Sequence, residues 1–119
     1  MDRKEKIRQY KETPLPAGIF RVKNIQSSKS FIGSSTNLPG MLNRQRFQLD
    51  NGSHVNRELQ KDWKELGSDA FVFEILDQLE PSDDPNRNQA EELQVLLDMW
   101  FDKLLVSGEQ IYGKPTNKS

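Results

Sequence analysis

The chain has 119 residues, a mass of 13.8 kDa and 34% hydrophobic residues, which suits one domain that buries a modest core without covalent staples. It contains no cysteine, and His54 is its only histidine, so disulfides, thiol nucleophiles and multi-histidine metal cages are excluded. No run of 18 apolar residues and no apolar signal-peptide core occurs. We therefore expect a cytoplasmic protein without a membrane partner.

The charges are segregated along the chain although the net charge is only −1. Residues 1–64 hold 13 Lys/Arg against 6 Asp/Glu, and residues 65–119 hold 4 against 12, which gives +7 and −8. Such asymmetry indicates a polyanionic partner for the basic half. The alternative is that the two halves neutralise each other in the fold.

The first elements in chain order are an arm and a β-hairpin. Residues 1–16 predict a basic helical arm that ends in a proline-containing linker, because Pro14 and Pro16 exclude regular helix there. Residues 17–24 have high strand propensity, and residues 29–34 predict the returning strand after a turn.

Two helices are expected after the hairpin. Asn37 is a favourable N-cap with Pro39 in the first turn, and residues 50–52 end this helix. Ser53 is expected to cap the second helix, and Gly67 to end it in a left-handed conformation. The expected apolar stripe of the second helix is Val55, Leu59, Trp63 and Leu66.

A third strand and a long helix complete the predicted domain. Residues 70–79 form the strongest strand candidate, and Asn88 is expected to cap a helix over residues 89–106. The expected inward face of that helix is Leu93, Leu96, Leu97, Trp100 and Leu104. The order β-β-α-α-β-α predicts an α+β domain over 17–107 with a mainly antiparallel sheet covered by helices. The tail, 108–119, is expected to be flexible.

Two tripeptides carry a family resemblance. Gly18–Phe20 (GIF) and, eleven positions on, Phe31–Gly33 (FIG) resemble the pair that names the GIY-YIG nuclease family. The resemblance extends over residues 17–105 and implies a three-stranded antiparallel sheet flanked by helices. It also implies DNA cleavage with one divalent metal ion in the active members. Further similar segments are 31–38, 51–54, 59–63, 71–76 and the position of Trp100.

The family's functional positions are mostly occupied by other residue types here. Its two tyrosines fall on Phe20 and Phe31, its arginine on Met41 and its metal-binding glutamate on Leu97, so that only His54 is retained. Leucine cannot bind Mg²⁺ and phenylalanine cannot exchange a proton. We therefore expect no intact catalytic residue, no metal site and no cofactor, and we expect the four apolar side chains to converge as core.

Some individual residues allow two interpretations. His54 is expected in the first turn of a helix, half-exposed, either without a role or as a remaining phosphate contact. Trp63 and Trp100 are expected to be core residues and not stacking platforms for bases. Phe47 lies opposite the apolar stripe of its helix, and it is either a contact for the N-terminal arm or an anchor for a partner.

Basic residues of the early strands and helices are candidates for nucleic-acid binding. Electrostatic contacts with phosphates need no catalytic group and can outlast the loss of chemistry. The resemblance places these elements around the nucleic-acid face. The candidates are Arg21, Lys23, Lys29, Arg44, Arg46, Arg57, Lys61 and Lys64.

Three functions are therefore open. The first is a catalytically degenerate domain that binds DNA or RNA weakly and without sequence preference. The second is an active metal-dependent DNA endonuclease that uses Mg²⁺ in a site rebuilt with His54, Glu74 or an arginine. The third is a protein-interaction module that uses Phe47 or the acidic loop 82–84.

Overall fold

The computed structural model describes residues 15–81 and 84–112, and the structural statements below concern these residues. The predicted arm up to residue 14, most of the acidic loop and the segment from 113 onward lie outside them. No helix in the described part of the chain combines the length and apolar character needed to cross a membrane.

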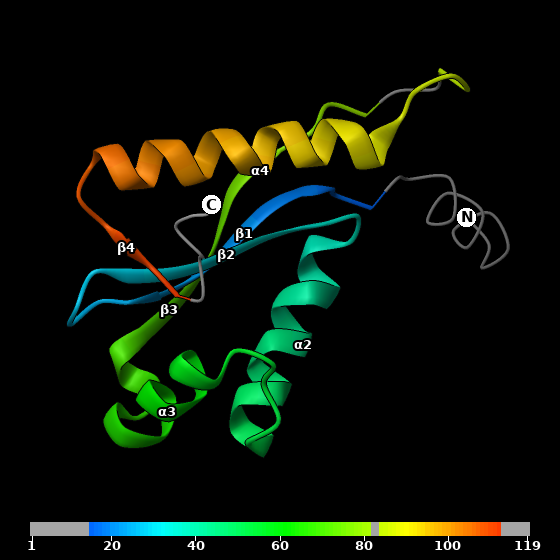
Figure 1. Ribbon diagram of the computed structural model, residues 1–119. Helices are drawn as coiled ribbons and strands as arrows, with labels where there is room; N and C mark the ends of the chain where they lie inside the picture. The colour runs from blue at the N-terminus through cyan, green and yellow to red at the C-terminus, as the bar shows by residue number, and fades with distance from the viewer. Residues whose placement is uncertain (1–14, 82–83, 113–119) are drawn as a thin grey trace, which may run out of the picture.

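Four strands form one mixed sheet in the order β3-β1-β2-β4 (Figure 1). They are β1 (Gly18–Asn24), β2 (Lys29–Ser35), β3 (Phe71–Gln78) and β4 (Gln110–Ile111). β1 pairs antiparallel with both β2 and β3, and β4 pairs parallel with the start of β2. The α+β class and the three antiparallel strands β3, β1 and β2 confirm the prediction, and β4 adds a fourth strand to it.

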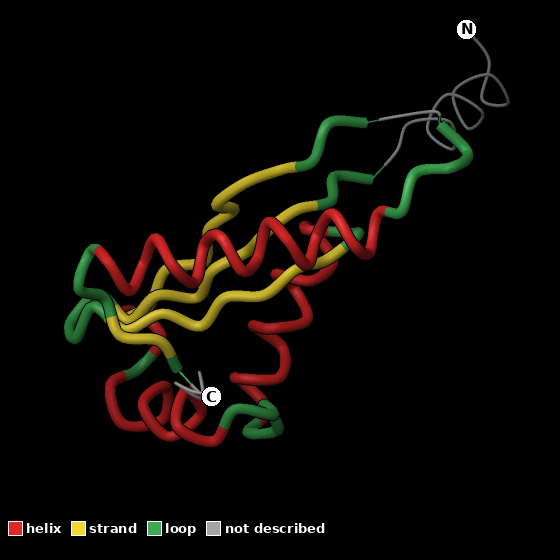
Figure 2. The backbone as a smooth tube through the Cα atoms, turned by 45° about the horizontal axis from the view of Figure 1, so that its top comes forward, coloured by secondary structure: helices red, strands yellow, loops and turns green. Residues whose placement is uncertain are grey.

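Helices cover both faces of this sheet. α4 (Gln89–Val106) lies along one face, whereas α2 (Leu38–Asn51) and α3 (Arg57–Leu66) lie on the other, as Figures 1 and 2 show from two directions. A short 3₁₀ turn, η1 (Ser68–Ala70), leads from α3 into β3. The result is a three-layer arrangement with the sheet in the middle.

Local capping signals explain where two of the helices begin and where one ends. The Asn37 side chain accepts a hydrogen bond from the Gly40 N–H at the start of α2, and Asn88 accepts one from the Glu91 N–H at the start of α4. Gly52 ends α2 with φ +79°, a left-handed conformation that glycine adopts without strain. These predicted boundaries are confirmed.

The start of α3 differs from the prediction. Asn56, and not Ser53, is the N-cap, and its side chain accepts a hydrogen bond from the Leu59 N–H. Val55 therefore precedes the helix and is 80% exposed, while Leu66 at its end is 41% exposed. The apolar stripe of α3 is reduced to its two central members, because a helix of ten residues presents fewer turns to the core.

The alternation of the strands assigns side chains to the two faces. Val22 of β1 pairs with Phe31 of β2, and both lie on the face covered by α2 and α3. On the α4 face, Trp100 Nε1 donates a 3.0 Å hydrogen bond to Asp77 Oδ2 of β3. The main core lies on the first of these faces and consists of Val22, Leu49, Leu59, Trp63, Ala70, Phe71 and Tyr112.

The beginning of the expected flexible tail is part of the fold. After β4 the side chain of Tyr112 is only 2% exposed, and its hydroxyl donates to Asp62 Oδ2 of α3 at 2.6 Å. Asn24 Nδ2 donates to the same hydroxyl at 3.0 Å. The backbone N–H of Tyr112 donates to the Ser30 carbonyl of β2. Residues 109–112 thus cover the edge of β2. A strand of two residues has no apolar pattern, so the sequence did not predict it.

Candidate nucleic-acid interface

The two positions of the family's tyrosines are apolar and packed together. Phe20 is 3% exposed, and its ring centroid lies 6.2 Å from that of Phe31. A methyl group added at Gly33 would lie 2.8 Å from the Phe20 ring, so the ring covers the backbone of β2 at this glycine. These two positions supply hydrocarbon surface and no proton donor or acceptor.

His54 is buried, which corrects the expectation that it is half-exposed. It is 6% exposed, and its ring meets the Phe31 ring edge-on with 5.0 Å between centroids. Its Nδ1 accepts a hydrogen bond from the Asn56 N–H at 3.0 Å, so Nε2 carries the proton and donates to Gln45 Oε1. Burial lowers the pKa of His54, which keeps the ring neutral. Both nitrogens are therefore engaged in holding the structure.

These residues belong to one connected set, which we call the filled cluster. Gln45 of α2 bridges His54 to Met41, because its Nε2 donates to Met41 Sδ at 3.4 Å. Leu97 lies on α4, which covers the other face of the sheet (Figure 1), and no hydrogen bond or ring contact joins it to the set. Three of the four expected apolar side chains are thus part of one cluster. The filled cluster consists of Phe20, Phe31, Met41, Gln45 and His54.

A divalent metal ion does not fit the family's position in this chain. Leu97 offers no ligand atom, and the described residues contain no group of three or more His, Cys, Asp or Glu side chains that could hold a metal ion. Glu74 could not join His54 at one centre, because it lies on the α4 face of the sheet, where Arg21 Nε donates to its carboxylate at 2.9 Å.

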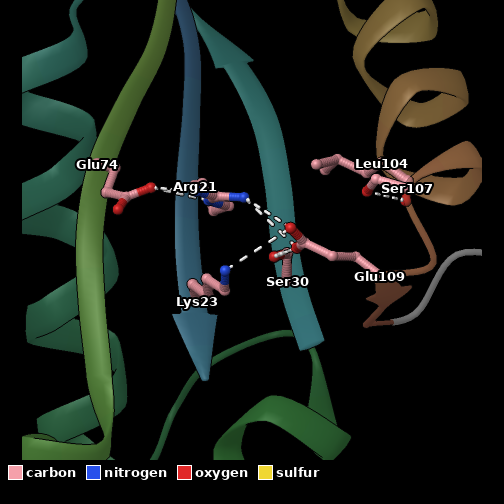
Figure 3. Close-up of polar contacts among 7 residues, drawn as sticks. All are labelled: Arg21, Lys23, Ser30, Glu74, Leu104, Ser107 and Glu109. Atoms are coloured by element: carbon pink, nitrogen blue, oxygen red, sulfur yellow. Dashed lines mark hydrogen bonds and ion pairs between the residues drawn. The ribbon is translucent and has the colours of Figure 1, made fainter. Parts of the chain in front are cut away.

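The cations of β1 are engaged within the fold (Figure 3). Arg21 donates to Glu74 and, over 3.4 Å, to Glu109 Oε1. Lys23 Nζ lies 3.7 Å from the same Glu109 carboxylate, which also accepts the Ser30 hydroxyl at 2.8 Å. Glu109, contributed by the segment after α4, therefore neutralises two residues that the sequence analysis assigned to nucleic-acid binding.

Two further candidates also have internal partners. Lys29 of β2 forms an ion pair with Glu58 of α3, and its Nζ lies 5.0 Å from the centre of the Tyr112 ring. The Arg46 guanidinium lies 4.6 Å from the centre of the Phe73 ring, which holds it against β3. Four of the candidate cations therefore interact with acidic or aromatic groups within the fold: Arg21, Lys23, Lys29 and Arg46.

The remaining candidates of α3 line an open groove. Arg57, Lys61 and Lys64 follow one another at helical spacing on one side of α3. No ion pair joins them to another described residue: Glu58 and Asp62 of the same helix contact Lys29 and Tyr112, and Glu65, one turn after Lys61, forms no ion pair with them. The groove has a volume of about 560 Å³. We call it the basic groove, and it is lined by Gly52, Ser53, His54, Arg57, Gln60, Lys61 and Lys64.

Gln60 positions one wall of the basic groove and was not singled out from the sequence. Its Oε1 accepts a hydrogen bond from the His54 N–H at 3.0 Å, and its Nε2 donates to the Leu49 carbonyl at 2.9 Å. It thereby fixes the loop 52–56 to α2. An exposed-looking glutamine in a charged helix gives no local signal for such a role.

Solved structures with the same fold are catalytic domains of a nuclease. The catalytic domain of a mutant of the intron endonuclease I-TevI superposes with a TM-score of 0.66 at 20% identity, over 83% of this chain and 93% of that chain. Another structure of the I-TevI catalytic domain gives a TM-score of 0.63 at 20% identity, over 79% and 94%. No family model and no curated protein match the sequence. The chain therefore has a GIY-YIG-like fold.

Proposed function

We propose that this GIY-YIG-like domain binds the phosphate backbone of nucleic acid weakly and without sequence preference, and that it does not hydrolyse it. The observation that carries the proposal is the basic groove, in which Arg57, Lys61 and Lys64 have no acidic partner among the described residues. Three cations at helical spacing give a positive track about two helical turns long. Such a track suits successive phosphates and reads no base.

The composition of the filled cluster supports the absence of hydrolysis. Cleavage of a phosphodiester needs a group that activates water and a metal ion or cation that stabilises the developing charge. Phe20, Phe31 and Met41 supply neither, and the two nitrogens of His54 are already bonded to Gln45 and Asn56. Binding and chemistry are therefore separable in this chain.

Equilibrium binding tests the proposal. We expect the full chain to bind a fluorescein-labelled oligonucleotide of about ten nucleotides at about 50 mM salt, measured by fluorescence anisotropy, with an affinity in the non-specific range. The combined variant Arg57→Gln, Lys61→Gln, Lys64→Gln should lose at least about tenfold in affinity. Lys61→Gln alone should weaken binding, whereas the charge-matched control Lys103→Gln on α4 should not.

Two results would contradict this proposal in different ways. Absence of binding at low salt would leave the protein-interaction function as the better account. Supercoiled plasmid that is nicked in Mg²⁺ or Mn²⁺, with nicking removed by a chelator and retained through repeated purification, would show that the chain is an enzyme. We expect the plasmid to stay supercoiled.

A further inference from the structure

One aromatic side chain of the described residues stands out by its exposure. Phe47 is 65% exposed on α2, about 200° around the helix from the buried Gln45. Its ring makes no aromatic or cation contact with another described residue. Trp63, by contrast, is 7% exposed, and Lys103 Nζ lies over the Trp100 ring, 4.7 Å from its centre.

The surroundings of Phe47 connect it to the basic groove. Arg44 lies one turn before it, and Asn51 one turn after it, on the same side of α2. Asp50 and Asn51 both line a second groove, of about 410 Å³, between the end of α2 and α3. Gly52 and Lys64 line both this groove and the basic groove. The surface from Arg44 through Phe47 to Lys64 is thus one continuous strip.

The charges on the two sides of Phe47 are opposite in sign. Arg44 lies about 60° from Phe47 on one side of the helix, and Asp50 lies about 60° from it on the other. Arg46, beyond Asp50, is held against the Phe73 ring. A polyanion that passes Phe47 is therefore attracted on the Arg44 side and repelled on the Asp50 side, and in the second groove it meets both Asp50 and Lys64.

An exposed aromatic ring beside cations has a specific use in nucleic-acid binding. Bases of a single strand stack on such rings at about 1–3 kcal/mol per base, whereas the bases of a duplex are already stacked on each other. An exposed ring on the outer side of α2 has no unpaired base to stack on when it meets the outer surface of a duplex. Phosphate contacts alone would need no exposed ring.

We propose that the nucleic acid bound here is single-stranded, with one unpaired base stacked on Phe47 and its neighbouring phosphates on Arg44 and the basic groove. This inference rests on the proposed function and adds the class of ligand to it. The ligand can be DNA or RNA, since the face of a base is the same in both.

The test compares ligands that differ in the presence of bases, in the sugar or in the number of strands. The full chain is titrated with labelled oligonucleotides of about ten nucleotides: oligo-dT, an abasic deoxyribose-phosphate strand of equal charge, oligo-rU and a duplex of equal length. We expect oligo-dT to bind more tightly than the abasic strand and the duplex. Phe47→Leu should weaken oligo-dT binding by about fivefold to a hundredfold and leave abasic-strand binding within about twofold.

Two control variants and one spectroscopic signal sharpen the test. Val55→Ala removes another exposed apolar side chain beside the basic groove and should leave oligo-dT binding unchanged. Phe47→Trp should retain binding, and the new indole's fluorescence should be quenched by oligo-dT but not by the abasic strand. An equal loss for oligo-rU in Phe47→Leu would show that the site accepts both kinds of strand, and a loss confined to one kind would identify the ligand.

The contradictory outcomes separate the two proposals. If oligo-dT and the abasic strand bind equally and Phe47→Leu changes nothing, or if the duplex binds most tightly, the single-strand inference is overturned while the groove remains a phosphate site. If no strand binds at about 50 mM salt, both proposals are wrong. Circular dichroism melting of Phe47→Leu serves as the control for folding.

Discussion

Two groups of cations in this chain have the same residue types and different surroundings. Arg21 and Lys23 on β1 lie against Glu109, 18% exposed, in a network that includes Glu74. Arg57 and Lys61 on α3 face a groove with no carboxylate opposite them. The basic half of the sequence is thus partly neutralised by the acidic half and partly left open.

The contrast shows that the acidic half neutralises the basic half at one surface and not at the other. The segment that contains Glu109 neutralises the strand cations across the α4 face of the sheet. On α3, Glu58 and Asp62 are turned to Lys29 and Tyr112, whereas Arg57, Lys61 and Lys64 line the basic groove. Under the proposed function, a polyanion would meet the second group and not the first.

The largest expected effect separates buried from exposed aromatic residues. Phe20→Ala should lower the free energy of unfolding by about 3–5 kcal/mol, because it opens a cavity in the filled cluster. Phe47→Leu should change it by less than about 0.5 kcal/mol, because the ring is on the surface. Urea denaturation measures both. A near-neutral Phe20→Ala would mean that position 20 lines an open cleft.

The next effect separates stability from binding. Arg21→Gln should lower the free energy of unfolding by about 1–2 kcal/mol, since it leaves Glu74 without its cation and Glu109 with Lys23 alone. Solvent screens part of the loss, because Glu74 is 39% exposed. Oligonucleotide affinity should stay within about twofold in the same variant. Loss of affinity without loss of stability would place the nucleic acid on the α4 face of the sheet. That result would contradict the assignment of the binding surface to α3.

A smaller effect concerns pH. Burial lowers the pKa of His54 below its ordinary value of 6.5, so the unfolded chain binds the proton more readily than the folded one. Stability from this residue is therefore fully present above about pH 6.5 and is lost as the pH falls through the folded-state pKa. Urea denaturation from about pH 7.5 to about pH 5.5 should show this decrease, and His54→Gln should flatten it. Stability that rises toward acid would contradict a neutral buried ring.

The smallest expected effect concerns Asp50. Asp50→Asn removes the acidic group beside Phe47, and oligo-dT affinity should increase by about twofold at low salt, with the gain lost as salt is raised. Anisotropy titrations at two salt concentrations measure this. A weaker affinity, or a gain that persists at high salt, would mean that Asp50 does not face the bound strand.

The sequence predicted those features that depend on neighbouring residues. Asn37, Gly52 and Asn88 mark helix ends because a cap is satisfied within a few positions along the chain. At α3 the prediction placed the cap at Ser53, three positions before the observed cap Asn56, because both residue types can accept the capping hydrogen bond.

The features that were missed depend on distant residues. Arg21 and Glu109 are 88 positions apart, so nothing near Arg21 reveals that it is neutralised. β4 exists because two residues pair with the edge of β2, and such a short strand has no periodicity to detect. The burial of His54 likewise depends on Gln45 and Phe31, which come from two other elements.

The salt dependence of oligonucleotide binding tests the central claim most directly. The logarithm of the association constant falls linearly with the logarithm of salt concentration, by about 0.7 per phosphate contact for a single strand. If Arg57, Lys61 and Lys64 each contact a phosphate, the combined variant to glutamine should have a slope shallower than the wild type by about 2. Equal slopes for the two proteins would contradict the basic groove as the nucleic-acid interface.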